Sequence, residues 1–469
     1  MSELLELSAR ELSAKLAARE VSAVELMRAT LDRVAAVNPA VNAIVSLRGT
    51  EALMAEAAAA DAGPRTGWLQ GIPVAVKDLV ATAGLRTTWG SPLFARHVPE
   101  ADDLLAARLK AAGAIVIGKT NVPEFGFGSH SYNPVHGVTR NPYDRARSAG
   151  GSSGGAGAAL AARMVAVADG SDAMGSLRNP AAWNNVYSLR PSHGLVPGDP
   201  QGEMFLHPLA TLGPMARDIA DLAALLETMA GPDPRVPTGR VFEARGLTAG
   251  SAGRRIGWLG DWGGAWPVED GILPLCEGAL SVFEELGFAV DPVAPPFPAE
   301  ALWQSWTTLR SWAAAGKQGT HYADPEARAQ LKPEVIWEIE RGLALPNADI
   351  LQAGATRSEW FRAAAALFER FDALVLPSAQ VWPFPADWHW PKEINGGPMD
   401  TYHRWMEAVV PVSLSGLPCL NLPAGFGAAG LPMGMQVFGP MGSDMRLLQL
   451  GQAYHTATDW PGRRPPPLD

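Results

Sequence analysis

A layered α/β fold, in which a mixed and largely parallel twisted sheet is covered on both faces by helices, is predicted from the alternation of two kinds of segment. Short apolar runs are typical of buried strands, and longer segments with helical periodicity lie between them. Strands are expected at 71–76, 114–117, 255–259 and 373–375, and helices at 104–112 and 273–286. Strands that alternate with helices favour parallel pairing.

The first 62 residues are expected to form an outer layer of helices without a chemical role. Ser8 and Glu11 match the S-x-x-E pattern of a capping box, and so do Ser22 and Glu25. Apolar residues after Ser22 recur at helical spacing, which indicates that one face of this helix packs on the rest of the protein.

Composition narrows the class of protein. The 469 residues contain no linker, so a single domain is expected over 1–469. The net charge of −10 argues against a nucleic-acid partner. Only Cys276 and Cys419 are present, so we expect no disulfide framework, no metal and no organic cofactor. The lack of a membrane-length apolar run and of a signal-peptide pattern predicts a cytoplasmic protein without membrane contact.

A glycine-serine segment at 147–180 carries the candidate chemistry. Glycines flank Ser152 and Ser153 on both sides, and glycine permits the positive φ angles and close backbone approach that a reaction site needs. The helix-forming run that follows would bring unpaired backbone N–H groups near Ser152, a setting suited to an oxyanion. A buried strand ending at Asp172 then leads into a tight turn that contains Ser176.

Residues 113–120, GAIVIGKT, match the spacing of a phosphate-binding loop. Such a loop needs its four intervening residues to curl around a phosphate and a helix to follow. Here the four residues are a strand-forming apolar run, and Pro123 follows closely. We therefore interpret this match as accidental.

The residues alone leave two assignments of the catalytic base open. Residues 150–154 fit the G-x-S-x-G nucleophile elbow of a Ser-His-Asp esterase, although the segment before the serine is a poor strand. Alternatively, Lys77 at the end of an apolar strand is placed for desolvation, which would lower its pKa and let it accept a serine proton. Against this, a lysine in this position could simply pair with Asp78 or extend to solvent.

Six motifs occur in order along the chain: GIPVAVKD at 71–78, GKTNVPEF at 118–125, NPYD at 141–144, GGSSGGA at 150–156, GSDAMGSLRNPAA at 170–182 and GLPCLNLPAGFGAAGLPMGMQVFGP at 416–440. Together they resemble the amidase signature family of serine hydrolases. The resemblance covers the helical layer at 1–62 and a signature core at 65–195, whereas about 290–400 forms a variable region. It implies the amidase-signature fold, an α/β/α sandwich.

The resemblance implies a Ser-cisSer-Lys triad. Ser176 matches the acylated nucleophile, and Lys77 matches the base. Ser152 matches the bridging serine, which follows a cis peptide bond and passes protons between the other two. Neutral Lys77 would accept the proton of Ser152 while Ser152 accepts that of Ser176.

The remaining site residues are also implied by the resemblance. Backbone N–H groups of the nucleophile turn match the oxyanion hole: Ala173, Met174, Gly175 and Ser176. The segment after GKTN matches the cleft wall and supplies candidate substrate contacts: Gly126, Phe127, Gly128 and Ser129. Asp172 and Arg178 match a structural ion pair, and Ser153 is expected to support the turn. Metal ligands are not implied.

Met174 departs from the family pattern, which commonly has glycine at this place. A methionine would be strained if the backbone required positive φ. We expect instead that the turn accepts the side chain and that Met174 narrows the acyl side of the pocket.

The implied activity is hydrolysis of linear amide C–N bonds through an acyl-enzyme. Tryptophans and prolines crowd residues 302–405, and although a single tryptophan is typical of core packing, together they indicate an apolar pocket wall. The tryptophans are Trp303, Trp306, Trp312, Trp337, Trp360, Trp382, Trp388, Trp390 and Trp405. We therefore expect apolar or aryl amides as substrates, with aryl esters and carbamates (urethanes) as chemically close ones.

Three other functions are weighed. One is the Ser-His-Asp esterase. Another is the amidase-like subunit of a tRNA-dependent amidotransferase, which the absence of a basic tail or surface disfavours. A non-catalytic ligand-binding homologue would be favoured only if Lys77, Ser152 or Ser176 were missing, and all are present. The expected partner is a small-molecule amide or carbamate, and the expected assembly is a monomer or homodimer.

Overall fold

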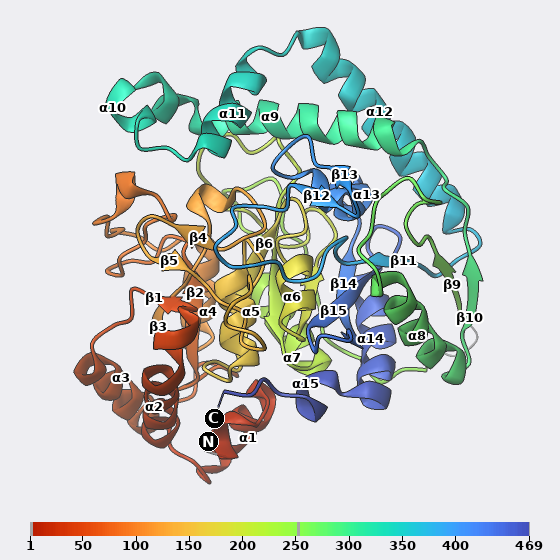
Figure 1. Ribbon diagram of the computed structural model, residues 1–469. Coiled ribbons are helices and arrows are strands. Elements are labelled where there is room, and N and C mark those ends of the chain that lie inside the picture. The colour runs from red at the N-terminus through yellow and green to blue at the C-terminus, as the bar shows by residue number, and fades with distance from the viewer. Residues whose placement is uncertain (1–2, 251–253, 469) are drawn as a thin grey trace.

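The main element of the computed structural model, which describes residues 3–250 and 254–468, is a mixed sheet of eight strands flanked by helices (Figure 1). In spatial order its strands are β10 (Ala289–Pro292), β9 (Arg255–Trp258), β11 (Ala373–Pro377), β15 (Pro432–Phe438), β14 (Cys419–Phe426), β7 (Tyr187–Arg190), β8 (Thr211–Ala216) and β6 (Val167–Asp172). The α/β class expected from the sequence is confirmed.

Strand direction changes across this sheet. β10, β9 and β11 pair in parallel, with α8 (Ile272–Glu285) in the chain between β9 and β11, as the helix and strand alternation predicts. From β11 to β6 all neighbouring strands are antiparallel. A short turn joins β14 directly to β15, and such a turn can only connect antiparallel strands.

A smaller sheet carries the lysine strand. Its strands, in spatial order, are β1 (Ile44–Val45), β3 (Ile115–Thr120) and β2 (Pro73–Lys77). β2 and β3 are parallel and are connected through α4 (Leu104–Ala111), as expected, whereas the short strand β1 was not expected. Because 115–120 form a straight strand in which the buried Lys119 donates to Thr82 Oγ1 at 2.7 Å, this segment is not a phosphate-binding loop.

The N-terminal residues form the expected helical layer, with α1 (Ala9–Ala18), α2 (Ala23–Val41) and α3 (Thr50–Ala62) at one corner of the molecule (Figure 1). Both predicted capping boxes are confirmed: Ser8 with Glu11 begins α1, and Ser22 with Glu25 begins α2.

Helices cover both faces of the large sheet. One layer contains α5 (Gly154–Ala161) and α6 (Arg178–Trp183), and the other contains α7 (Ile219–Met229), α8 and α14 (Asp444–Thr458). Every residue of α5 is buried, and its small side chains permit close packing. A Cβ atom at Gly155 would lie 2.2 Å from the backbone nitrogen of Asn121. This close approach places the serines before α5 next to the ends of β2 and β3.

A further group of helices crosses one side of the molecule, above the sheet in Figure 1, and is built mostly from the region that departs from the family motifs. It comprises α9 (Ala299–Ala323), α10 (Pro325–Arg328), α11 (Pro333–Leu343), α12 (Asn347–Leu367) and α13 (Val410–Ser415). α9 packs against both α11 and α12, and its inner face looks toward the serines.

The remaining elements are short. They are α15 (Trp460–Arg463), the two-stranded pairs β4 (Tyr132–Asn133) with β5 (Gly137–Val138) and β12 (Glu393–Ile394) with β13 (Gly397–Pro398), and four 3-10 helices, η1 (Glu3–Leu5), η2 (Pro92–Phe94), η3 (Glu124–Gly126) and η4 (Arg404–Val409). Within 3–250 and 254–468, no helix combines the length and apolar character needed to cross a membrane. The same ranges contain no group of three or more His, Cys, Asp or Glu side chains that could hold a metal ion.

Candidate active site

Three segments that are far apart in the sequence meet beside the edge of the large sheet. Lys77 is the last residue of β2, Ser152 lies just before α5, and Ser176 lies in the turn between β6 and α6. β2 contacts β6, and α5 contacts both strands. The three candidate catalytic residues are therefore positioned by regular elements.

The Lys77 amine is surrounded by serine hydroxyls. Lys77 is fully buried, and its Nζ lies 2.9 Å from Ser152 Oγ, 2.7 Å from Ser153 Oγ and 2.9 Å from Ser171 Oγ. A neutral amine has two N–H donors and one lone pair, so it can donate to two of these hydroxyls and accept a hydrogen bond from the third. The arrangement suits an uncharged lysine that accepts the Ser152 proton.

Burial lowers the pKa of Lys77 to about 7, and the negative charges of Asp169 and Asp172 oppose that shift. Asp169 is close to the lysine because its Oδ1 accepts a hydrogen bond from the Lys77 backbone N–H at 3.0 Å. Burial in turn raises the pKa of Asp169. At neutral pH a substantial share of Lys77 is therefore uncharged and able to act as a base.

The peptide bond between Gly151 and Ser152 is cis, as the family resemblance implies. Ser129 Oγ donates to the Gly151 carbonyl oxygen at 2.6 Å, and Ser131 Oγ donates to the Ser152 carbonyl oxygen at 3.5 Å. Ser129 was expected to contact substrate. It supports the backbone that carries Ser152 instead, and it does not line the cavity beside the serines.

Ser176 opens onto the same cavity as Ser152. Its residue is 7% exposed, and its carbonyl oxygen accepts a hydrogen bond from the Ser153 N–H at 3.2 Å. Across the described residues, the Ser176 hydroxyl makes no hydrogen bond. Of the two links that the triad requires, the one from Lys77 to Ser152 is formed in this conformation, and the one from Ser152 to Ser176 is not.

Asp172 holds the nucleophile turn in place through two arginines. Arg178 Nη2 lies 3.0 Å from Asp172 Oδ1, Arg190 Nη1 lies 3.1 Å from the same oxygen, and all three side chains are fully buried. Burial alone would raise the pKa of Asp172, but the two guanidinium groups hold it well below its usual range. The expected pair of Asp172 with Arg178 is present, and Arg190 adds a partner that the sequence did not indicate.

The backbone N–H groups of the turn are not equivalent. The Gly175 N–H donates to Asp172 Oδ1 at 2.9 Å, so the prediction that Gly175 supplies an oxyanion donor is wrong in this conformation. The N–H groups of Ala173, Met174 and Ser176 form no hydrogen bond with any described residue. Gly175 has φ +79°, and a Cβ there would lie 2.1 Å from Asn179 Oδ1, so this position requires glycine.

Met174 fits the turn without the strain considered above, because it is not among the residues with positive φ. Its side chain is buried, and its Sδ accepts a hydrogen bond from Trp306 Nε1 at 3.2 Å. Trp306 lines the cavity, whereas Met174 does not. The expectation that Met174 itself narrows the pocket is therefore corrected: it supports the tryptophan that forms the wall.

The cavity beside the serines has a volume of about 250 Å³. Of the four predicted contact residues, Gly126 and Phe127 line it, and Gly128 and Ser129 do not. The other apolar lining residues include Leu79, Phe125, Trp306 and Leu209. A neighbouring hollow of about 750 Å³ shares part of this lining, so the two spaces adjoin around Ser171.

The tryptophans divide between core and cavity. Trp306 lines the cavity beside the serines, and Trp312 lines the neighbouring hollow. Trp303, Trp360 and Trp405 are buried in the main apolar core. The wall is aromatic as expected, but Trp306 and the two phenylalanines supply most of it.

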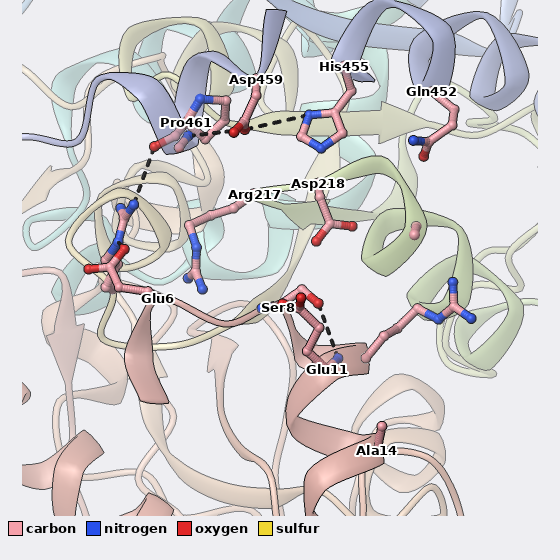
Figure 2. Close-up of a pocket in the computed structure, with 14 residues that line it drawn as sticks. Glu6, Ser8, Glu11, Ala14, Arg217, Asp218, Gln452, His455, Asp459 and Pro461 are labelled. Carbon is pink, nitrogen blue, oxygen red and sulfur yellow. Dashed lines mark hydrogen bonds and ion pairs between the residues drawn. The ribbon is translucent and has the colours of Figure 1, made fainter. Parts of the chain in front are cut away.

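A separate hollow of about 620 Å³ lies between α1 and α14 (Figure 2). Its guanidinium groups are bound to main-chain carbonyls: Arg217 Nη2 donates to Leu7 O at 2.7 Å, and Arg163 Nη2 donates to Pro461 O at 3.3 Å. Neither Lys77 nor the glycine-serine turn contributes to its lining. This hollow is therefore not the reaction site.

Sequence reasoning missed several residues of the site. Asp169 and Ser171 stand two apart in β6, so they project from the same face toward Lys77, and strand alternation could have identified them. Arg190 on β7 and Arg310 on α9 reach the site only through the tertiary fold.

Comparison with known proteins agrees with this geometry. Residues 25–448 match the family model described as Amidase. The chain is 38% identical to the amidase-like component of the glutamyl-tRNA(Gln) amidotransferase from Thermus thermophilus, over 96% of this chain and 97% of that protein. It is 32% identical to an acylamidase from Rhodococcus erythropolis, over 98% and 97% of the respective chains.

A solved structure of a bacterial aryl acylamidase, described as an amidase signature enzyme, superposes with a TM-score of 0.89 at 29% identity and covers 99% of this chain and 100% of that one. The family match, the relatives and the fold agree over almost the entire length. The chain therefore belongs to the amidase family, among the amidase signature enzymes.

Proposed function

We propose that this amidase-family hydrolase cleaves linear amides with apolar or aryl groups through an acyl-enzyme on Ser176. The observation that carries the proposal is the buried Lys77 amine, 2.9 Å from Ser152 Oγ, at a cavity that Ser152 and Ser176 both line. Within the described residues Ser152 bonds to this amine and not to an imidazole, which disfavours the Ser-His-Asp alternative.

The reaction follows from this geometry in balanced steps. When substrate binds, the Ser176 hydroxyl turns toward Ser152. Neutral Lys77 takes the Ser152 proton, Ser152 takes the Ser176 proton, and Ser176 Oγ attacks the substrate carbonyl. The resulting oxyanion accepts hydrogen bonds from free N–H groups of the turn. The C–N bond then breaks as the relay returns the proton to the departing amine, and water releases the acid by the same route.

The lining of the cavity supports the substrate class. Phe125, Phe127 and Trp306 give it aromatic walls, and Leu79 and Leu209 add aliphatic surface. Such a lining favours apolar acyl or aryl groups. The names of two similar proteins, an acylamidase and an aryl acylamidase, agree with this choice. Aryl esters and carbamates place a comparable carbonyl before the same nucleophile, so we include them as further substrates.

A matched panel tests the proposal. One acyl group is presented as a p-nitroanilide, a p-nitrophenyl ester and a carbamate to the wild type, Ser176→Ala and the control Ser281→Ala on the surface helix α8. We expect amide cleavage by the wild type and the control and its loss in Ser176→Ala. After treatment with a fluorophosphonate, mass spectrometry should place the adduct on Ser176. An adduct on Ser153 that requires a histidine would instead support the esterase.

Glutamine hydrolysis is a second candidate, favoured by the identity with the glutamyl-tRNA(Gln) amidotransferase component over nearly the full chain. The net charge of −10 gives no support for tRNA contact by this chain itself. Ammonia release from glutamine, compared with aniline release from an acyl anilide, separates the two candidates. We expect the anilide to be the better substrate.

A further inference from the structure

The inner face of α9 presents a cation to the cavity beside the serines. Trp306, Arg310 and Ala314 are spaced four residues apart, so they share one side of the helix, and all three line the cavity together with Ser152 and Ser176. The Arg310 side chain is 13% exposed. We propose that Arg310 binds a carboxylate carried by the substrate, an inference that rests on the proposed function of the same site.

The guanidinium group of Arg310 is held on two of its nitrogens and free on the third. Nε donates to Glu338 Oε1 at 2.6 Å, and Nη2 donates to Tyr402 OH at 2.7 Å. In the described part of the chain, Nη1 forms no hydrogen bond, and it is not among the enclosed polar atoms that lack a partner. An arginine anchored in this way offers its remaining donors in a fixed direction, with little loss of side-chain freedom on binding.

The carboxylate that anchors Arg310 is itself fully engaged. Glu338 is buried, its Oε1 also accepts from Tyr402 OH at 2.8 Å, and its Oε2 accepts from Ser311 Oγ at 2.5 Å. Glu338 therefore fixes the guanidinium group from behind. It does not line the cavity.

The charge of the lining favours an anion. Arg310 and Lys317 both line the cavity, and none of its described lining residues is a carboxylate. This contrasts with the net charge of −10 for the whole chain. Arginine forms strong, directional hydrogen bonds with carboxylates, more so where water is partly excluded. The favoured substrate thus joins an apolar body, which contacts the aromatic walls, to an acidic end.

A purely structural role for Arg310 makes a different prediction. Its guanidinium carbon lies 5.1 Å from the centre of the Phe127 ring, so it also supports that wall. If this were its only role, a substitution would reduce the hydrolysis of charged and uncharged substrates by the same factor. Substrate binding by Arg310 would make the reduction larger for the charged substrate.

The test uses two substrates that differ only in charge: the mono-p-nitroanilide of hexanedioic acid and its methyl ester. We expect kcat/KM of the full-length wild type to be at least about tenfold higher for the free acid, which corresponds to about 1.4 kcal/mol. Arg310→Lys keeps a cation beside Glu338 but loses the free nitrogen, so this preference should fall below about threefold. Arg245→Lys, at a residue that is 85% exposed, is the matched control and should retain the preference.

Each outcome decides the question. Equal or faster anilide cleavage of the methyl ester by the wild type overturns the inference and leaves the proposed function standing, even if Arg310→Lys does not fold. An equal loss on both substrates in Arg310→Lys assigns Arg310 to structure alone. Cleavage of neither anilide by the wild type overturns the proposed function and this inference together.

Discussion

The side-chain nitrogen of Lys77 lies 2.9 Å from the hydroxyl oxygen of Ser152, in a position that solvent does not reach. One group thus has two properties that usually exclude each other, burial and basicity. Burial removes the stabilisation that water gives an ammonium ion, and the neighbouring hydroxyls accommodate the neutral amine. The following predictions start from this contact.

The rate should depend on the protonation of Lys77. Because only the neutral amine accepts a proton and its pKa is lowered to about 7, log kcat/KM should rise with unit slope up to about pH 7 and then level off. Lys77→Met should lower kcat by about 10²–10⁴-fold. A pH series with a p-nitroanilide measures both. A flat profile from pH 5 to 9 would contradict the role of Lys77.

Asp169 should tune that profile. Its negative charge raises the Lys77 pKa against the effect of burial, so Asp169→Asn should lower this pKa further. Asparagine keeps an oxygen that can accept from the Lys77 backbone N–H. We therefore expect the acid limb of the pH profile to move to lower pH. Asp349→Asn, on the exposed side of α12, serves as the control. A shift to higher pH would contradict the proposed coupling.

The ion pair of Asp172 with Arg178 should matter for stability as well as for rate. Arg178→Met leaves Asp172 with Arg190 alone, and breaking a buried pair in this way costs about 3–5 kcal/mol. Because Asp172 also accepts from the Gly175 N–H, the nucleophile turn should loosen and activity should fall. Urea unfolding and anilide hydrolysis measure the two effects. The exposed pair of Arg235 with Asp233 provides the comparison: Arg235→Met should change stability little.

Met174 should act on selectivity through Trp306. Met174→Gly removes the side chain behind the tryptophan, and emptying such a buried site costs about 2–5 kcal/mol. The preference for bulky over small anilides should change more than the turnover of acetanilide itself. Met174→Leu, which keeps the volume and loses only the sulfur acceptor, should stay close to wild type. An unchanged substrate profile in Met174→Gly would refute the idea.

Gly155 tests the close packing of α5. A methyl group there would meet main-chain atoms, 2.2 Å from Asn121 N and 2.7 Å from Ala43 O, which cannot move aside cheaply. Gly155→Ala should therefore prevent folding or lower the melting temperature severely. Gly354→Ala on α12 is the matched control, since nothing lies within 4 Å of its Cβ, and alanine should stabilise that helix by about 0.5–1 kcal/mol. Calorimetry compares the two variants, and equal melting temperatures would contradict the packing argument.

The sequence predicts those parts of the protein whose signals are local. The capping boxes at Ser8 and Ser22, the strand that ends at Lys77 and the glycine-serine turn all depend on neighbouring residues. The antiparallel part of the sheet was less evident, because apolar runs do not encode direction. The glycine-rich turn at 427–430 between β14 and β15 was the available signal.

The partners of the site were harder to predict because they come from distant segments. Arg190 and Arg310 stand in β7 and α9, and neither segment shows from its own residues that it faces the serines. The hydrogen bond of the Gly175 N–H likewise depends on how the turn folds back on Asp172. Such contacts follow from the tertiary arrangement alone.

Arg178 has a consequence for how the enzyme is made. It follows the nucleophile by two positions, yet its guanidinium group also binds the Val409 carbonyl at 3.0 Å, Ser413 Oγ at 2.6 Å and Gln436 Oε1 at 2.6 Å. During translation these three acceptors leave the ribosome more than two hundred residues after the arginine. A nascent chain that carries every triad residue therefore still lacks the contacts that fix its reactive turn, and it becomes a working catalyst only once its last strands are in place.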